Sequence, residues 1–170
     1  KELSEIFLKV IGSPDLNGRQ LNGMGGGVSS VSKCVIISPS EREDADVDYN
    51  FIQLAVDKPI AEWNNNCPNI SGAVGPYAIQ EGILKSKEGE NMVRIYQVNT
   101  DKIIHSTFSV KDGKPEIDGD YSIAGVTGNN SKVRLDYLDL VARELANYFQ
   151  LAIQLMRLTS RILVKLKFLS

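Results

Sequence analysis

One cysteine of this chain, Cys67, lies in surroundings that suggest chemistry. It follows a run of asparagines in the segment NNNCPNISGAVG (64–75), whereas the other cysteine, Cys34, lies in the apolar run CVIIS. A helix beginning at Asn69 would place the Cys67 thiol beside the free backbone N–H groups of its first turn, where anions are favoured and the pKa of a thiol is lowered. The segment therefore indicates a reactive thiol or a carboxylate-binding place, with an inert turn cysteine as the structural alternative.

A glycine- and serine-rich segment, NGMGGGVSSVSKCVIIS (22–38), is the second feature with chemical potential. Its glycines let the backbone approach a ligand closely, and its serines offer hydroxyl groups. The segment lacks the GxxxxGK[ST] spacing of a phosphate loop, and no strand precedes it as a dinucleotide-binding GxGxxG turn requires. Lys33 leads into an apolar strand, where desolvation favours the neutral amine and makes it a candidate base; a surface lysine at a strand end is the alternative.

The remaining pattern predicts the elements that position these residues. Residues 3–11 carry apolar side chains at helical spacing, with Ser4 as a candidate cap and Gly12 as a natural stop. Segments rich in β-branched and aromatic residues, bounded by turn residues, predict strands at 34–38, 46–57, 92–100, 102–110 and 116–123. The order of these elements predicts an α+β fold.

A second helix is predicted over 69–83. Its apolar residues recur at helical spacing, and Asn69 is its expected N-cap. Gly75 and Pro76 fall inside this span and would kink the helix unless packing compensates.

Length and composition set the class of protein. With 170 residues, 42% hydrophobic and 24% charged, the chain can bury one ordinary core. A formal net charge of −2 gives no electrostatic reason to expect nucleic acid as a partner. Two cysteines in unlike settings and one histidine predict neither a disulfide framework nor a metal site. No signal-peptide pattern follows Lys1, so we expect a reducing, cytoplasmic location.

Three long segments resemble one known family. They are GSPDLNGRQLNGMGGGVSSVSKCVIISPS (12–40), DADVDYNFIQL (44–54) and NCPNISGAVGPYAI (66–79). Members of the 2-methylaconitate cis-trans isomerase (PrpF-like) family carry the corresponding patterns GSPDxxGRQxDGMGGGxSSTSKVxIxSPS, DADVDYxFxQV and NCGNxSxAVGPFAI. The resemblance covers nearly all of residues 10–135 and is far more specific than a short motif.

The resemblance implies a diaminopimelate-epimerase-like fold, in which two similar domains each wrap strands around a central helix and the active site lies between them. By this resemblance, the family's proposed catalytic lysine corresponds to Lys33 and the cysteine of its active-site cleft corresponds to Cys67. The resemblance implies cofactor-free proton transfer next to a carboxylate-activated double bond, on 2-methylaconitate or a similar tricarboxylate, as in the 4-oxalomesaconate tautomerases. Helix-end N–H groups and small polar residues would hold the carboxylates: Gly25, Gly26, Gly27, Ser29, Ser30, Ser32, Asn66, Asn69 and Ser71.

This chain departs from the family pattern at two positions near the expected site. NCPN replaces NCGN, so Pro68 removes a backbone donor beside the thiol, and Asn22 stands where aspartate is common. These changes alter the individual anion contacts that the resemblance implies, whereas the family resemblance stands.

The last part of the chain differs in character from the rest. Residues 1–139 carry 14 Lys and Arg against 20 Asp and Glu, a balance of −6, whereas residues 140–170 carry 5 against 1, a balance of +4. LVARELANYFQLAIQ (140–154) stands where family members carry a segment GKLLPTGN and begin a second domain. Codons that encode this segment can also encode GKLLPTGN in a shifted reading frame, in which the third base of each codon is read with the first two bases of the next. We therefore interpret 1–139 as a partial first domain and 140–170 as a frameshifted tail.

Two kinds of function follow from these patterns. The first is isomerisation of small unsaturated polycarboxylates by the intact relative, with this fragment inactive; a 4-oxalomesaconate-type tautomerase is the variant of that hypothesis. The second is a non-catalytic remnant, because one wall of a cleft cannot close around a substrate. The alternative to a frameshift is that 140–170 is a genuine amphipathic tail that binds a membrane or a partner. We expect no membrane binding. The exposed surface of an incomplete domain would allow self-association.

Overall fold

A computed structural model describes residues 2–138 of the chain. Over this range, two α-helices, one short 3-10 helix and seven strands follow one another. In chain order they are α1 (Glu2–Ile11), η1 (Ser29–Val31), β1 (Lys33–Pro39), β2 (Val47–Leu54), β3 (Ala61–Glu62), α2 (Pro68–Gln80), β4 (Gly89–Gln97), β5 (Lys102–Lys111), β6 (Lys114–Pro115) and β7 (Arg134–Leu138). The predicted α+β class is confirmed.

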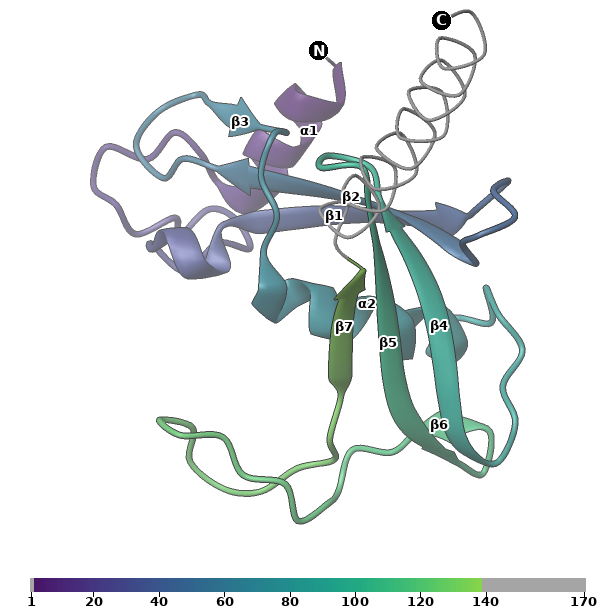
Figure 1. The fold of residues 1–170 in the computed structure, drawn as a ribbon. Helices are drawn as coiled ribbons and strands as arrows, with labels where there is room; N and C mark the ends of the chain where they lie inside the picture. The colour runs from purple at the N-terminus through teal and green to yellow at the C-terminus, as the bar shows by residue number, and fades with distance from the viewer. Residues whose placement is uncertain (1, 139–170) are drawn as a thin grey trace, which may run out of the picture. The chain divides into compact units, whose positions relative to one another are not determined.

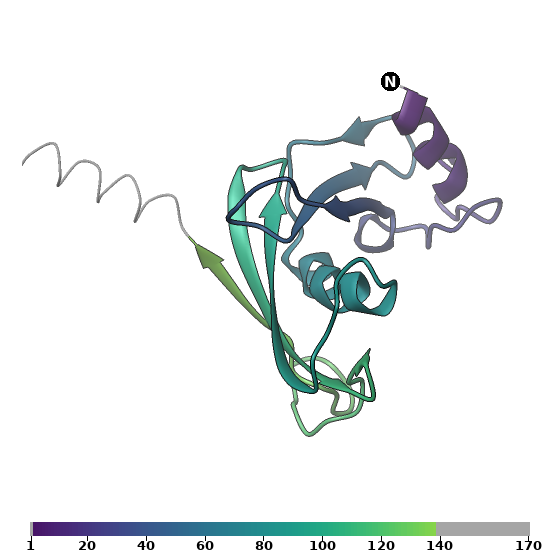
Figure 2. The ribbon, with the colours of Figure 1, turned by 90° about the vertical axis from the view of Figure 1, so that its right-hand side faces the viewer.

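The seven strands form one sheet in the order β1-β2-β4-β5-β6, with β3 paired to β2 and β7 paired to β5. The pairs β1–β2, β2–β3, β4–β5 and β5–β6 are antiparallel, whereas β2 and β4 pair parallel. Parallel neighbours need a crossover connection, and α2 lies within that connection. The crossover lays α2 against β4 and β5, and the strands curve around it (Figures 1 and 2).

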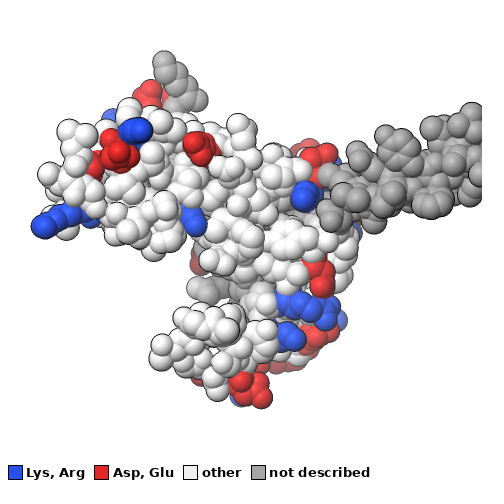
Figure 3. Space-filling view, turned by 60° about the vertical axis from the view of Figure 1, so that its left-hand side comes forward, with Lys and Arg blue, Asp and Glu red and all other residues white. Residues whose placement is uncertain are grey.

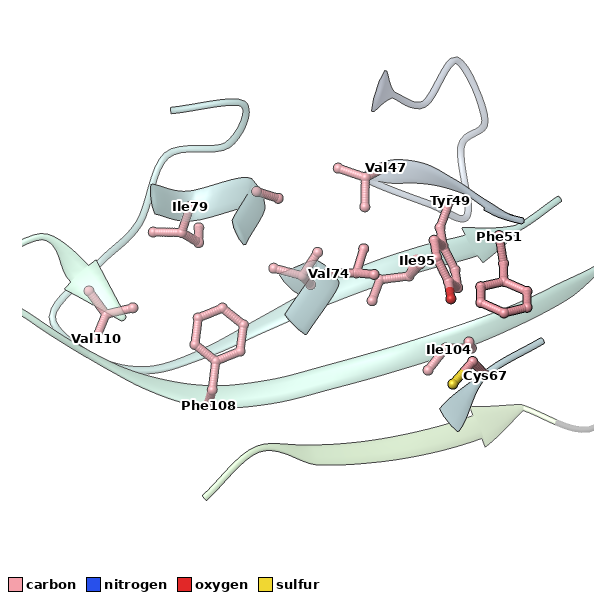
Figure 4. Close-up of a cluster of buried hydrophobic side chains, with 12 residues drawn as sticks. Val47, Tyr49, Phe51, Cys67, Val74, Ile79, Ile95, Ile104, Phe108 and Val110 are labelled. Carbon is pink, nitrogen blue, oxygen red and sulfur yellow. The ribbon is translucent and has the colours of Figure 1, made fainter. Parts of the chain in front are cut away.

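Strand β2 separates two clusters of buried apolar residues. Because successive side chains of a strand point to opposite faces, Val47, Tyr49 and Phe51 join the cluster on the α2 face, while Ile52 and Leu54 join the cluster on the α1 face. Figure 4 shows the first cluster, with the sulfur of Cys67 beside Ile104 at one end of it. The start of α2 is therefore fixed by the same core that holds the sheet.

Helix α2 continues through Gly75 and Pro76, and its packing against β5 requires the glycine. A Cβ atom at Gly75 would lie 2.7 Å from the Ser106 hydroxyl oxygen and 2.9 Å from the Phe108 ring, both on β5. Only glycine allows so close an approach of helix and strand. Pro76 follows inside the helix without ending it, so packing compensates for the weak local propensity.

Three local predictions are wrong. Ser4 lies inside α1, where its hydroxyl accepts a hydrogen bond from the Trp63 indole at 3.1 Å, so it is no cap. Asn69 lies in the first turn of α2, and Cys67 is the N-cap residue, because Pro68 has the fixed backbone φ that suits the first helical position. The segment 116–123 forms only an isolated bridge at Tyr121, since its residues are exposed and have no sheet face to bury.

The acidic residues of the described part do not gather on one face. On the face shown in Figure 3, acidic and basic residues are interspersed, and no continuous basic patch is visible there. Among the described helices, neither is long and apolar enough to cross a membrane. The predicted frameshifted tail lies outside the residues that the structure describes.

Candidate active site

The Lys33 side-chain nitrogen donates a hydrogen bond to the Cys67 sulfur at 3.1 Å, although the two residues are 34 positions apart. Lys33 is the first residue of β1, and Cys67 immediately precedes α2. The cluster that joins β1, β2 and α2 brings these two element ends together. The structure therefore places side by side the two residues that the sequence singled out.

The surroundings of Cys67 favour the thiolate. Burial raises the pKa of this thiol, but the backbone N–H of Ile70, the Lys33 side chain and the backbone N–H of Asn69 act in the opposite direction. The balance lies below the ordinary thiol pKa. Free N–H groups and the helix dipole at the start of α2 supply this stabilisation of negative charge, as the sequence predicted for a thiol at a helix start.

Two other titratable groups near the sheet are unsuitable as bases at neutral pH. Burial raises the pKa of the Tyr49 hydroxyl to about 12, so it remains protonated. Burial also raises the pKa of the Cys34 thiol. The contrast between the two cysteines follows from the helix end and the lysine at Cys67.

The glycine-rich segment packs closely against its own chain. A Cβ at Gly25 would collide with the Gln20 side chain, and one at Gly27 would collide with the Gly18 carbonyl oxygen. Gly27 also has a φ of +72°, a conformation that side chains disfavour. Close packing and backbone conformation therefore explain why these positions are glycine, while their predicted contact with a ligand stays a prediction.

A buried glutamine, Gln20, holds this segment together, and the sequence analysis missed it. Its Nε2 donates to the Ser13 hydroxyl at 2.9 Å, and its Oε1 accepts from the Gly27 N–H at 2.9 Å and from the Ser32 hydroxyl at 2.8 Å. Ser32 is completely buried and directly precedes Lys33. Glutamine in a polar turn carries no local signal of burial, so only the fold reveals this role.

The predicted binding serines divide into two groups. Ser29 and Ser30 are exposed in η1, close to Lys33 in the chain. Ser32 and Ser71 are buried, and their hydroxyls are engaged within the protein.

The helix start itself is stabilised by side chains. The Ser71 hydroxyl is within hydrogen-bond distance of the Cys67 carbonyl oxygen, at 2.9 Å, and of the Asn66 side-chain oxygen, at 3.1 Å. Asn69 is exposed on the first turn, and Asn66, which directly precedes Cys67 in the chain, is half-buried. Of these predicted binding residues, Asn66 and Asn69 keep surface accessible to a ligand.

Two more residues that the sequence analysis missed position the segment before Cys67. The Asn99 side-chain oxygen accepts a hydrogen bond from the Phe51 N–H at 2.7 Å. Its Nδ2 donates to the Phe51 carbonyl at 2.9 Å and to the Trp63 carbonyl. The Gln97 amide, which is completely buried, donates to Asn99 at 2.9 Å. Gln97 is the last residue of β4 and Asn99 follows it in YQVNT, and their residue type is the only signal that the sequence offered.

Two cavities lie near the site without containing the pair. One, of about 420 Å³, is apolar and lies between β1 and α2, lined by Val35, Ile36, Ile37, Ile70, Ala73, Val74 and Tyr77. The other, of about 560 Å³, is polar and is lined by residues of 12–22, including Asp15 and Arg19. Neither Lys33 nor Cys67 lines these two cavities, so the shared concave surface stays a prediction. Within residues 2–138, no three His, Cys, Asp or Glu residues gather as a metal site.

A solved structure shares this fold. The crystal structure of methylitaconate-delta-isomerase superposes with a TM-score of 0.75 at 41% sequence identity, over 78% of this chain and 34% of that chain. The fold described above therefore corresponds to about a third of that protein.

Curated relatives agree with the structural match. The chain is 43% identical to the 2-methyl-aconitate isomerase of Cupriavidus necator, over 82% of this chain and 36% of the relative. It is 41% identical to the 3-methylitaconate isomerase of Eubacterium barkeri, over 79% and 35%, and 39% identical to the 4-oxalomesaconate tautomerase of Pseudomonas putida, over 79% and 37%. The chain thus spans little more than a third of the length of these relatives.

A family model described as PrpF protein matches residues 1–150. That range takes in Lys33 and Cys67, all of the described elements and the beginning of the 140–170 segment. The extent of this match and the identity to the relatives show that the chain belongs to the PrpF family.

Proposed function

We propose that Lys33 and Cys67 form the proton-transfer pair of an isomerase that acts on small unsaturated polycarboxylic acids. The observation that carries the proposal is the 3.1 Å hydrogen bond between the two side chains at the start of α2. A 1,3-shift along an allylic system needs one group to remove a proton at one carbon and a group to return a proton at the other, and two titratable side chains in contact can reach both carbons.

The thiolate is the base in this proposal, and the lysine ammonium is the acid. The Cys67 thiolate removes the proton from the carbon next to the double bond, and the electrons move into the conjugated carboxylate. The Lys33 ammonium then returns a proton to the other end of the allylic system. The thiol and amine that remain are in contact, so one proton transfer from sulfur to nitrogen restores the starting state. This assignment reverses the roles that the sequence suggested, because the pKa of Cys67 is lowered.

Negative charge develops on the substrate during this reaction and needs donors. The exposed hydroxyls of Ser29 and Ser30 and the first turn of α2 at Asn69 are the described groups best placed to supply them. Fixed donors aimed at developing charge lower the barrier because they need no reorganisation during the reaction. Tricarboxylates such as 2-methylaconitate, and the related 4-oxalomesaconate, carry the negative charge that these donors would bind.

The described residues form one wall of the proposed site. Because the chain spans little more than a third of its relatives, we propose that turnover requires the remaining length, which would exclude water and supply the opposing donors. The 170-residue chain is then a non-catalytic domain by itself, which is the second function that the sequence suggested.

The test uses two proteins: the 170-residue chain, and a version extended to the length of its relatives with the 140–170 segment read in the alternative frame. Each is incubated with 2-methylaconitate, 3-methylitaconate or 4-oxalomesaconate while conjugated-acid absorbance is followed. We expect turnover only in the extended version, and a loss on the order of 100-fold or more in its Lys33→Ala and Cys67→Ser variants. Cys34→Ser, which alters a thiol outside the pair, is the matched control and retains activity.

Two results contradict the proposal. Turnover by the 170-residue chain would show that one wall is sufficient. An extended enzyme that retains full activity without Lys33 or without Cys67 would show that the pair does not transfer the protons.

A further inference from the structure

We propose that Lys33 and Cys67 also form a site of reversible oxidative crosslinking, in which a peroxide oxidises the thiol and the lysine amine closes a sulfur–nitrogen bond. The Nζ and Sγ atoms already lie 3.1 Å apart. The four-carbon stem of lysine is flexible enough to shorten that distance to a covalent one. This inference concerns the side chains themselves and does not depend on isomerase activity.

The chemistry balances with one molecule of hydrogen peroxide. In the first step the Cys67 thiolate attacks the peroxide, so that an S–O bond forms and the O–O bond breaks. Sulfur is oxidised by two electrons and the peroxide is reduced. The hydroxide that leaves takes a proton from the Lys33 ammonium, which gives water and a neutral amine. The products are a sulfenic acid and a nucleophile in contact with it.

In the second step the Lys33 nitrogen attacks the sulfur of the sulfenic acid. An N–S bond forms, the S–O bond breaks, and the oxygen leaves as water with a proton from nitrogen and the hydroxyl proton. The product is a sulfenamide that joins β1 to the start of α2. A thiol reductant cleaves it by attack on sulfur, which returns the lysine amine and, after exchange, the cysteine thiol.

Residue 68 removes the usual competitor for this reaction. A sulfenic acid can condense with a backbone nitrogen to form a cyclic sulfenamide, but the nitrogen must carry a proton to lose. The residue after Cys67 is Pro68, which has no backbone N–H. The adjacent backbone position therefore cannot capture the oxidised sulfur, whereas the Lys33 amine is a side-chain nucleophile already in contact with it.

The other cysteine is also unsuited to capture it. Cys34 packs with the cluster of Leu8 and Ile52 on the α1 face of the sheet, whereas Cys67 belongs to the cluster on the α2 face. Neighbouring residues of a strand point to opposite faces, so Lys33 and Cys34 are directed away from each other. A disulfide would require the two thiols to cross the sheet, while the lysine contact requires no rearrangement of the backbone.

Local access suits a small oxidant. Cys67 retains 8% of its surface exposed, and Lys33 beside it is half-buried. Such an opening is compatible with the entry of a small oxidant such as hydrogen peroxide and of a small reductant such as dithiothreitol. The crosslink would protect the cysteine from irreversible oxidation to sulfinic and sulfonic acids.

The experiment uses the full 170-residue chain with Cys34→Ser, so that Cys67 is its one thiol. The protein is treated with hydrogen peroxide and its intact mass is measured before and after addition of dithiothreitol. We expect a product about 2 Da lighter than the starting protein, since two hydrogens are lost and no oxygen is retained. Tandem mass spectrometry of a tryptic digest should locate a Lys33–Cys67 link, and dithiothreitol should restore the original mass.

Lys33→Arg in the same background is the matched variant, because it keeps the positive charge but removes the nucleophilic amine. We expect the lighter product to be absent from it and the tryptic peptide that contains Cys67 to gain one to three oxygens instead. Lys33→Leu is a second variant, which removes the amine without adding an oxidisable side chain, and circular dichroism checks that each variant folds. A lighter product that persists without Lys33, or oxygen addition to Cys67 at equal rates with and without Lys33, would overturn the proposal.

Discussion

The Lys33 nitrogen donates a hydrogen bond of 3.1 Å to the Cys67 sulfur, from the first residue of β1 to the N-cap of α2. The contact joins a cation to a thiol at a helix N-terminus, where two independent sources of positive potential act on one sulfur. The reactivity of Cys67 should therefore depend on both sources.

The two cysteines should react at different pH. The pKa of Cys67 lies below its ordinary value and burial raises that of Cys34, so thiolate forms at Cys67 first as the pH rises. We expect the iodoacetamide alkylation rate of Cys67 to reach half its maximum at a lower pH than that of Cys34. Peptide mass spectrometry across a pH series measures both curves in one sample. Coincident curves would contradict the assigned environments.

Removal of the Lys33 charge should move only one of these curves. Lys33→Met takes away a cation that favours the Cys67 thiolate, so the half-maximal pH of Cys67 should rise. Cys34 follows Lys33 in the chain but packs on the other face of the sheet, so its curve serves as the internal reference. A shift of both curves would indicate unfolding rather than loss of the contact.

Gln20 should contribute to stability more than an exposed glutamine does. Its side chain makes hydrogen bonds to Ser13, Gly27 and Ser32 in the protein interior. Gln20→Ala leaves these groups without that partner and should lower the free energy of unfolding by about 1–3 kcal/mol. Gln80→Ala, at the exposed end of α2, is the matched control and should change it by less than about 0.5 kcal/mol. Urea unfolding measures both variants, and equal effects would remove the role assigned to Gln20.

Gly27 and Gly82 provide a matched test of backbone approach. Both have positive φ, +72° and +70°, but a Cβ at Gly27 meets the Gly18 carbonyl whereas none lies within 4 Å at Gly82. Gly82→Ala should cost about 1–2 kcal/mol from the conformation alone, and Gly27→Ala should cost more because of the collision. Thermal unfolding orders the two variants. A Gly27→Ala protein as stable as Gly82→Ala would show that the segment shifts freely.

The Asp46–Arg94 ion pair should make stability depend on pH. Burial raises the pKa of the Asp46 carboxyl, but the hydrogen bonds and charge of Arg94 outweigh it, so the folded pKa lies below its ordinary value. A depressed pKa contributes stability that is present above the unfolded value, about pH 4, and is lost as the pH falls through the folded value. The difference between Asp46→Asn and the parent protein should therefore be largest at neutral pH and shrink in acid.

An exposed ion pair supplies the control for this test. Asp136 pairs with Arg134 at 2.9 Å on β7, with both side chains about half exposed, and Asp136→Asn should change stability little at any pH. Urea unfolding at neutral and acid pH compares the variants. If the Asp46→Asn difference were the same at both pH values, the ion pair would not be its source.

The sequence by itself determined the local elements. Alternating apolar residues in 46–57 predicted β2, and the structure confirms it as Val47–Leu54; helices were predicted close to α1 and α2. These features depend on the period of side chains along one segment, which a sequence displays directly. Where a segment had no face to bury, as in 116–123, the composition predicted a strand that did not form.

Only the tertiary structure decided which distant residues meet. The contact of Lys33 with Cys67 depends on the pairing of β1 with β2 and on the parallel placement of β4, which locates α2 in the crossover. The burial of Gln20 and the close approach at Gly27 likewise depend on how a polar segment folds back on itself. Such contacts arise when separate elements pack on a common core, and no property of a single segment encodes the distance between them.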